Sequence, residues 1–319
     1  MKIIVTTYPF GHTNNTPIKI LQENKLDFCL NEAKRKLTKE EHWAILADQQ
    51  PDVIIAGTEK YDSATLDISK NLKMISRVGI GIDGIDLNYC KMKGIIVTNT
   101  PDAPSNAVAE LTICQILNML RKIQNVSNDM ILKDKWNRYI GRELKDCIVG
   151  IIGFGRVGKL VWKKLRCFDP KHIYINDLES HQITSHFQIP ASIKELLTES
   201  DIISLHIPLN DGKFNNTNFI RDVELNMMKP DVRLLNMSRG GIINEKDLYD
   251  WLIRRPKATV ALDTFTSEPY NGILSHMGNV YSTPHLGSCT TRARYDMEVG
   301  AVNNVIDYLN NTPLKDRVV

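Results

Sequence analysis

The stretch CIVGIIGFGRVGK, residues 147–159, decides the fold of this chain. It opens with the apolar run of a buried strand and continues into Gly153-Phe154-Gly155-Arg156-Val157-Gly158 at the start of an amphipathic helix. The first two glycines allow a tight turn and a close approach to a pyrophosphate, and the third lets helix and strand pack. The amides of Arg156 and Val157 would point at the phosphates. The stretch therefore predicts a dinucleotide site in an α/β domain.

The next predicted strand ends in Ile175-Asn176-Asp177, which indicates the type of dinucleotide. Asp177 lies 177 − 158 = 19 residues beyond Gly158, close to the position at which a carboxylate binds the ribose hydroxyls. A carboxylate there would repel the additional phosphate of NADP. We therefore expect NAD as the cofactor; the alternative is that Asp177 only caps or solvates a loop.

Further apolar runs after residue 147 predict a doubly wound parallel sheet. The six predicted strands are Cys147–Ile152, His172–Asn176, Ile202–His206, Val232–Asn236, Thr259–Asp263 and Val280–Ser282. Ser192 and Glu195 form a capping-box pattern at one intervening helix, and Asn244 opens another. This part of the chain therefore reads as one α/β unit.

The first hundred residues predict a second, smaller α/β unit. Its expected strands are Ile3–Thr6, Val53–Ala56, Met74–Val78 and Ile95–Thr98, with a helix at Lys39–Asp48. A helix over 105–122, capped by Ser105 or Asn106, leads into the second unit, and a helix over 292–309 returns to the first. We expect a domain of residues 1–99 plus 286–319 and an inserted domain of residues 100–285, with a hinge and a cleft between them.

Composition excludes several classes of function. The net charge of +3 is small and evenly spread, which argues against nucleic-acid or membrane surfaces. The six cysteines form no CxxC pair, and no stretch has the length of a membrane helix or a signal peptide, so a cytoplasmic protein is expected. The histidines show no metal-ligand spacing; His181 and His186, five apart in a polar stretch, are expected to be solvated, so no metal is predicted.

Three blocks at the ends of predicted strands carry an arginine, a carboxylate and a histidine: Arg239, Glu268 and His285. Ligands bind at the carboxyl ends of strands in open α/β sheets. Histidine can exchange a hydroxyl proton near neutral pH, a carboxylate can fix its tautomer, and arginine can hold a carboxylate. Taken singly, each could be an ordinary loop residue. Together, downstream of a dinucleotide motif, they predict a hydride-transferring dehydrogenase.

The chain resembles the D-isomer-specific 2-hydroxyacid dehydrogenases over nearly its whole length. The resembling blocks are "RVGIGIDGID", "TPDAPSNAVAELT", "GIIGFGRVGK", "SLHIPL", "MKPDVRLLNMSRGGIINE", "ALDTFTSEP" and "TPHLGSCT". The resemblance implies a flavodoxin-like substrate domain with an inserted Rossmann-type NAD domain, in a homodimer or tetramer. It implies that Arg239 orients the substrate and that Glu268 and His285 form the proton relay. Thr264 departs from the family, which usually has valine there.

The resemblance also implies the positions that line the cofactor. Asp263 matches the family aspartate near the nicotinamide amide, and Met237 and Ser238 match cofactor-lining positions. The remaining residues expected to line the cofactor are His206, Pro208 and Gly287.

The loop Ser76–Asp83 is the predicted substrate site of the first unit. The amides around Gly79, Ile80 and Gly81 can form an anion-binding nest for a carboxylate, although a plain turn capped by Asp83 or Asp86 is the alternative. By resemblance, Arg77 separates phosphoglycerate dehydrogenases from many glyoxylate and hydroxypyruvate reductases.

Two further residues complete the predicted substrate site. Arg138 resembles a residue that reaches the neighbouring subunit's site, and Asn106 a substrate-side polar residue; a solvated helix end and a helix cap are their alternatives. Because two arginines could bind a phosphate dianion, we favour 3-phosphoglycerate as the substrate.

Two alternative functions remain. One is a glyoxylate or hydroxypyruvate reductase, or a dehydrogenase of another short D-2-hydroxy acid. The other is an NAD-sensing corepressor-type binding protein, since such relatives retain the same three residues. The resemblance is to members without a C-terminal regulatory domain, so no inhibition by serine is expected.

Overall fold

The computed structural model describes residues 1–178, 188–210 and 214–319. The chain divides into two compact units, residues 1–104 with 288–319 and residues 105–287. These boundaries lie a few residues beyond the predicted ones. Residues just after 99 stay with the first unit because the Thr100 amide donates to the Gly79 carbonyl and the Thr100 hydroxyl accepts from the Gly79 amide.

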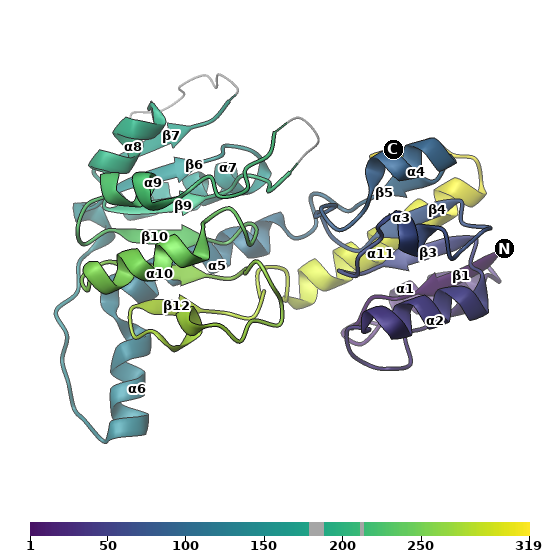
Figure 1. Cartoon of the computed structure of the whole chain (residues 1–319), viewed down its shortest axis with the longest axis horizontal. Helices are drawn as coiled ribbons and strands as arrows, with labels where there is room; N and C mark the ends of the chain where they lie inside the picture. The colour runs from purple at the N-terminus through teal and green to yellow at the C-terminus, as the bar shows by residue number, and fades with distance from the viewer. Residues whose placement is uncertain (179–187, 211–213) are drawn as a thin grey trace. The chain divides into compact units, whose positions relative to one another are not determined.

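The first unit is a five-stranded parallel sheet covered on both faces (Figure 1). Its elements are β1 (Lys2–Val5), α1 (Thr16–Glu23), β2 (Asp27–Cys29), α2 (Lys39–Gln49), β3 (Val53–Ala56), α3 (Ser63–Leu66), β4 (Met74–Arg77), α4 (Leu87–Lys93), β5 (Ile96–Thr98) and α11 (Thr291–Leu309). The strand order is β2-β1-β3-β4-β5, the flavodoxin-like order. The strand order therefore reverses between β1 and β3: β2 lies on one side of β1, and β3, β4 and β5 lie on the other.

Alternating side chains of this sheet build two cores. Val53 and Ile55 face α1 and α11, whereas Ile54 faces the side covered by α2, α3 and α4. All three side chains are fully buried. A strand buried on both faces explains why Val53–Ala56 is apolar without alternation.

The second unit is a seven-stranded parallel sheet. It begins with α5 (Ser105–Arg121) and α6 (Ile123–Lys133), which precede the sheet in sequence. The remaining elements are β6 (Ile148–Ile152), α7 (Arg156–Leu165), β7 (His172–Asn176), β8 (Gln188–Pro190), α8 (Ile193–Glu199), β9 (Ile202–Leu205), α9 (Asp222–Met227), β10 (Arg233–Asn236), α10 (Glu245–Arg254), β11 (Thr259–Leu262) and β12 (Val280–Ser282). The order β12-β11-β10-β9-β6-β7-β8 reverses between β6 and β9.

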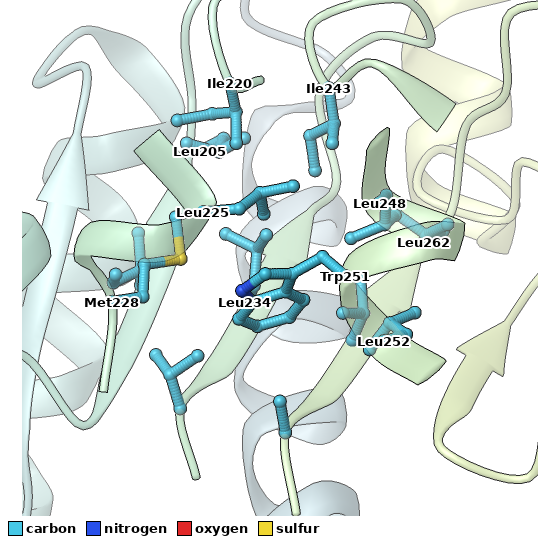
Figure 2. Packing of buried hydrophobic residues seen from close by; sticks show 14 of the residues in the cluster. Leu205, Ile220, Leu225, Met228, Leu234, Ile243, Leu248, Trp251, Leu252 and Leu262 are labelled. Atoms are coloured by element: carbon cyan, nitrogen blue, oxygen red, sulfur yellow. The ribbon is translucent and has the colours of Figure 1, made fainter. Parts of the chain in front are cut away.

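The larger core of this unit lies between the sheet and helices α9 and α10. Figure 2 shows the indole of Trp251 from α10 packed among leucines of the sheet and of both helices, including Leu225 and Leu234. The opposite face is covered by α5 and α7, which bury Ile116 and Val161. Truncation of a buried side chain of the size of Trp251 typically costs about 3–5 kcal/mol, so this cluster fixes the strands that bear the site.

The predicted fold class, two doubly wound α/β domains with one inserted into the other, is confirmed. One strand was missed in each sheet: β2, which makes five strands instead of four in the first, and β8, which makes seven instead of six in the second. Both are three-residue edge strands that begin with a polar residue and show no apolar run. The Asn244 cap is confirmed, because its side chain accepts from the Asp247 amide. At Ser192 the structure has only the half of the box that accepts the Glu195 amide.

The expected cap at Asn106 was wrong. The helix already begins at Ser105, and the Asn106 side chain donates to Glu110 one turn later, 2.8 Å away.

His181 and His186 lie outside the described residues. Within the described ranges, no helix is long and apolar enough to cross a membrane. The same ranges contain no group of three or more His, Cys, Asp or Glu side chains that could hold a metal ion.

Candidate functional site

The glycine turn after β6 requires glycine at its first and third positions. Gly153 has φ +92°, and a Cβ there would lie 2.7 Å from the carbonyl carbon of His206. Gly155 is the N-cap of α7, and a Cβ on it would meet nothing within 4 Å. A Cβ on Gly158 would collide with the Gly153 carbonyl oxygen. The turn is thus tight at its first glycine, open at its second and packed against the helix at its third.

The N-terminus of α7 fits a bound pyrophosphate. The first-turn amides of Val157 and Gly158 have no acceptor in their own helix, and the helix dipole favours negative charge at this end. The Asp177 carboxylate at the end of β7 accepts a hydrogen bond from the Phe154 amide inside the turn. The predicted ribose carboxylate therefore lies beside the predicted phosphate loop.

His206 follows β9, directly beside the glycine turn. Its Nε2 lies 2.8 Å from the Ser204 hydroxyl, and burial lowers the pKa of His206 to about 3. Its Nδ1 is buried and has no hydrogen-bond partner among the described residues. His206 is therefore a neutral imidazole at the point where the sheet reverses. Pro208, two residues on, is exposed, and its carbonyl accepts from Asn216.

Asn236 at the end of β10 holds the turn that carries Arg239. Its Oδ1 accepts from the Ser238 amide and hydroxyl at 3.1 and 2.8 Å, and its Nδ2 donates to the Arg239 carbonyl at 2.7 Å. An Arg239 Nη1 donates to the Ser238 carbonyl, and Met237 is buried in the core. Our sequence analysis gave Asn236 no role; the signal was a polar residue closing a buried strand.

Glu268 and His285 are brought together by two loops of the second unit. His285 Nδ1 lies 2.8 Å from Glu268 Oε2, and Glu268 Oε1 accepts from the Phe265 amide at 3.1 Å. The carboxylate is thus held by a backbone donor while it binds the imidazole. Whenever the ring is neutral, this contact places the proton on Nδ1 and makes Nε2 the acceptor nitrogen.

Asp263 organises the loop of His285. Its Oδ1 accepts from the Thr283 hydroxyl and the Leu286 amide at 2.6 and 2.7 Å, and its Oδ2 from the Gly287 amide at 2.8 Å. The His285 amide donates to the Asp263 carbonyl at 2.9 Å. Burial raises the pKa of Asp263 against these donors. His285 itself has φ +55°, a left-handed conformation that costs a non-glycine residue about 1–2 kcal/mol.

The loop after β4 carries the predicted anion site of the first unit. The Arg77 guanidinium folds back over its own loop, where Nη1 donates to the Val78 carbonyl and would collide with a Cβ on Gly79. The Gly79 amide donates to Thr100 Oγ1 and is not available to a ligand. The amides of Ile80 and Gly81 donate no hydrogen bond within the described residues. The candidate donors of the predicted anion nest are therefore the Arg77 guanidinium and the amides of Ile80 and Gly81.

Asn106 and Arg138 show no sign of such a site. Asn106 is exposed and donates to Glu110, as described above. Arg138 is exposed in the segment after α6 and makes no hydrogen bond with any described residue.

Comparison with known proteins identifies the family. Residues 113–287, more than half of the chain, match the model of the D-isomer specific 2-hydroxyacid dehydrogenase family, NAD binding domain. The chain belongs to this family. The match confirms the predicted cofactor, NAD, for the second unit of this D-2-hydroxyacid dehydrogenase family member.

The similar proteins differ in their names. A D-3-phosphoglycerate dehydrogenase of Sus scrofa is 34% identical over 86% of this chain, which spans only 54% of that relative. A glyoxylate reductase of Thermofilum pendens is 36% identical over 79% of this chain and 76% of its own length. The NAD+-bound 3-phosphoglycerate dehydrogenase structure from Entamoeba histolytica is 29% identical, with a TM-score of 0.82 over 100% of this chain and 98% of that one.

Proposed function

We propose that this chain is an NAD-dependent oxidoreductase that transfers a hydride between C2 of a D-2-hydroxy acid, or its 2-oxo acid, and nicotinamide. The observation that carries the proposal is the 2.8 Å contact between His285 Nδ1 and Glu268 Oε2, in a unit that carries the glycine turn. When bound, NAD supplies the hydride acceptor or donor. The protein's own residues hold the substrate and move the proton.

His285 moves the proton of the substrate hydroxyl. In the oxidation direction Nε2 takes the proton of the C2 hydroxyl while the C2 hydrogen leaves as hydride, giving the 2-oxo acid. Glu268 stabilises the imidazolium that forms, because its carboxylate accepts from Nδ1–H. In the reverse direction Nε2–H returns the proton to the carbonyl oxygen. Arg239 is assigned to the substrate carboxylate. The amides of Ile80 and Gly81 in the first unit are proposed as an anion nest.

Replacement of His285 by alanine tests the proposal. We expect kcat to fall roughly 10²–10⁴-fold, the usual contribution of general acid–base catalysis, with the NADH dissociation constant unchanged. His276→Ala is the matched control, since His276 is an exposed histidine of the same unit. Equal turnover by wild type and His285→Ala on every substrate would contradict the assignment. Absence of turnover on any 2-oxo acid by wild type would favour the corepressor-type alternative.

Two substrate classes are candidates. D-3-phosphoglycerate and phosphohydroxypyruvate are supported by Arg77, whose guanidinium lies over the Gly79 loop. Hydroxypyruvate, glyoxylate or another unphosphorylated acid is supported by a carboxylate at the same edge of the first sheet, Glu59. Arg77→Ala discriminates: under the phosphate assignment kcat/KM falls for phosphohydroxypyruvate but not for pyruvate.

We also propose a homodimer formed through α6 and the segment after it. Apolar side chains are exposed there, including Trp136 at 82% and Ile140 at 94%. The segment is nevertheless held in place, because Asp129 accepts from Lys133 Nζ, Asn137 Nδ2 and Tyr139 Oη at 2.7–2.8 Å. These hydrogen bonds, that of Lys133 first, hold the pKa of Asp129 well below its ordinary value. A preorganised apolar surface of this kind suits a second copy of the chain.

Light scattering after gel filtration tests the dimer. Ile140→Lys should give a monomer, whereas Met92→Lys, at another exposed apolar side chain, should not. A monomeric wild type at micromolar concentration would contradict the dimer. A cytoplasmic location is proposed on the six cysteines, all of which are thiols, and cell fractionation tests it.

A further inference from the structure

The first sheet has its own point of reversal, between β1 and β3. In open α/β sheets ligands bind at the carboxyl ends of the strands where the order reverses, and in flavodoxin-like domains this is the β1/β3 point. The residues that follow these two strands are Thr6 and Thr7 after β1 and Gly57 to Glu59 after β3. No pattern in the sequence marked them.

A buried carboxylate lies at this point. Glu59 is 6% exposed, and its Oε2 accepts from the Gly57 amide at 3.0 Å and from Thr6 Oγ1 at 3.2 Å. Gly57 is needed for this fold-back, since a Cβ there would lie 2.8 Å from Glu59 Oε2 and 3.0 Å from Thr7 Cα. A buried carboxylate costs stability unless it is hydrogen-bonded, so a glutamate placed here needs a reason.

The network around Glu59 has a defined direction. Tyr61 Oη lies 2.9 Å from Thr6 Oγ1, and both side chains are fully buried. Because the single proton of Thr6 is donated to Glu59, Tyr61 must donate to Thr6. The chain of donors thus ends on Glu59 Oε2. Glu59 Oε1 accepts no hydrogen bond from any described residue, and it still has lone pairs for a further donor.

The same network borders the predicted anion loop. The Tyr61 amide donates to the Gly84 carbonyl at 2.7 Å, and Ala56 at the end of β3 is paired with Arg77 at the end of β4. Burial first, and then the negative charge of Glu59, raise the pKa of Tyr61, while Arg77 opposes the rise. A carboxylate and a guanidinium therefore share this edge of the sheet. The negative charge of Glu59 at this edge disfavours a phosphate dianion.

We propose that Glu59 is a specificity-determining residue whose Oε1 accepts a hydrogen bond from a hydroxyl or ammonium group on the third carbon of the 2-oxo acid. This inference rests on the dehydrogenase function proposed above. Glu59 then accepts from the distal donor of the substrate, at the edge of the sheet where β3 and β4 end. The preferred substrates carry a donor on C3, as hydroxypyruvate does. Phosphohydroxypyruvate is disfavoured by charge, and glyoxylate and pyruvate lack the donor.

The wild-type chain gives the first test, by loss of NADH absorbance with hydroxypyruvate, pyruvate, glyoxylate and phosphohydroxypyruvate. We expect kcat/KM for hydroxypyruvate to exceed that of each of the others by about tenfold, the value of one good hydrogen bond to a charged group. A preference for phosphohydroxypyruvate or glyoxylate over hydroxypyruvate overturns the inference but leaves the dehydrogenase function intact. No turnover of any of the four overturns both proposals.

Glu59→Gln gives the second test, since it keeps the size of the side chain and removes its charge. The ratio of kcat/KM for hydroxypyruvate to that for phosphohydroxypyruvate should fall about tenfold, with kcat/KM for pyruvate unchanged. The pyruvate value separates a specificity role from a structural one, because a structural defect would lower kcat/KM for all substrates together. Glu32→Gln, at an exposed glutamate of the same unit, is the control. An unchanged ratio, or an equal fall on every substrate, overturns the inference; if the variant does not fold, the wild-type substrate order decides.

Discussion

The two parallel sheets of this chain each reverse their strand order once, and the two points of reversal are built differently. At β6/β9 the residues come mostly from one contiguous motif, with Gly153 packed against the carbonyl of His206. At β1/β3 they come from separate segments, with Thr6 bonded to Glu59 across 53 positions of sequence.

The difference shows which constraints leave a trace in a sequence. Backbone constraints are local: a positive φ and a helix packed on a turn require glycines at fixed spacing. A hydrogen-bond network between distant segments requires only donors and acceptors, which many residue types supply. The first point of reversal could be found from a pattern, whereas the second becomes visible only in three dimensions.

Alanine at the first glycine of each point of reversal should give the largest contrast. Gly153→Ala combines a left-handed φ with a clash against backbone, so we expect a loss of about 3 kcal/mol in the free energy of unfolding. Gly57→Ala meets the end of a flexible carboxylate at 2.8 Å and touches Thr7 Cα at 3.0 Å, so it should cost less, about 1 kcal/mol. Urea unfolding of both variants measures the two values; equal losses would mean that the points of reversal are equally rigid.

Asp263→Asn should separate activity from stability in the second unit. An amide nitrogen would face one of the N–H donors of Leu286 or Gly287, loosening the loop of His285. We expect kcat to fall roughly 10²-fold, equivalent to about 2.7 kcal/mol. The free energy of unfolding should change little, because burial already raises the pKa of Asp263 and the variant removes that cost.

Steady-state kinetics and unfolding on the same preparation of Asp263→Asn make this comparison. Asp250→Asn, at an exposed aspartate, is its control. A kcat equal to that of wild type would show that the loop is held without Asp263.

Acid should destabilise the β6/β9 point through His206. Its pKa in the folded chain, about 3, lies below the ordinary 6.5, so the unfolded chain binds the proton first. The contribution of the neutral ring to the free energy of unfolding is therefore fully present above pH 6.5. It is lost as the pH falls from about 6.5 toward 3. Between pH 7.5 and pH 5 the loss from this group is about 2 kcal/mol.

Unfolding of wild type and His206→Gln at both pH values isolates this contribution. The variant should have the shallower pH dependence. If the two proteins lose stability in parallel between pH 7.5 and pH 5, His206 is protonated in the folded chain.

Loss of a helix cap should lower the free energy of unfolding by the same amount in both units. Asp86 accepts from the Tyr89 amide in the first unit and Asn244 from the Asp247 amide in the second. Replacement of either by alanine should cost about 1 kcal/mol, since each satisfies one amide at a helix N-terminus. Thermal unfolding of the two variants measures this smallest effect; a cost of several kcal/mol at either position would point to a role beyond the cap.

The site residues that could be predicted are likewise those marked by a local pattern, and the residues missed act through bonds to other segments. The glycine turn, Asp177 and the Glu268–His285 pair could be found because each follows a strand that is recognisable from its apolar run. Asn236 and Thr283 flank these residues but act only through bonds to their neighbours. A sequence marks Asn236 only as a polar residue at the end of an apolar strand.

The strands that escaped prediction are two short edge strands without an apolar run. β2 has only three residues, two of them exposed, at a sheet edge, and β8 is an equally short edge strand that ends in proline. Neither can show a period of two over its length. The Asn106 cap failed for another reason: the helix began one residue earlier, and the amide found Glu110 as a partner.

The left-handed backbone of His285 has a consequence for any attempt to improve this protein by selection for stability alone. Glycine would adopt φ +55° with no steric cost, and asparagine with little. A library screened only for resistance to heat or protease would therefore enrich replacements at position 285 that fold better and catalyse nothing. The position is one where chemistry and conformational preference pull in opposite directions, so engineering for robustness must leave it fixed.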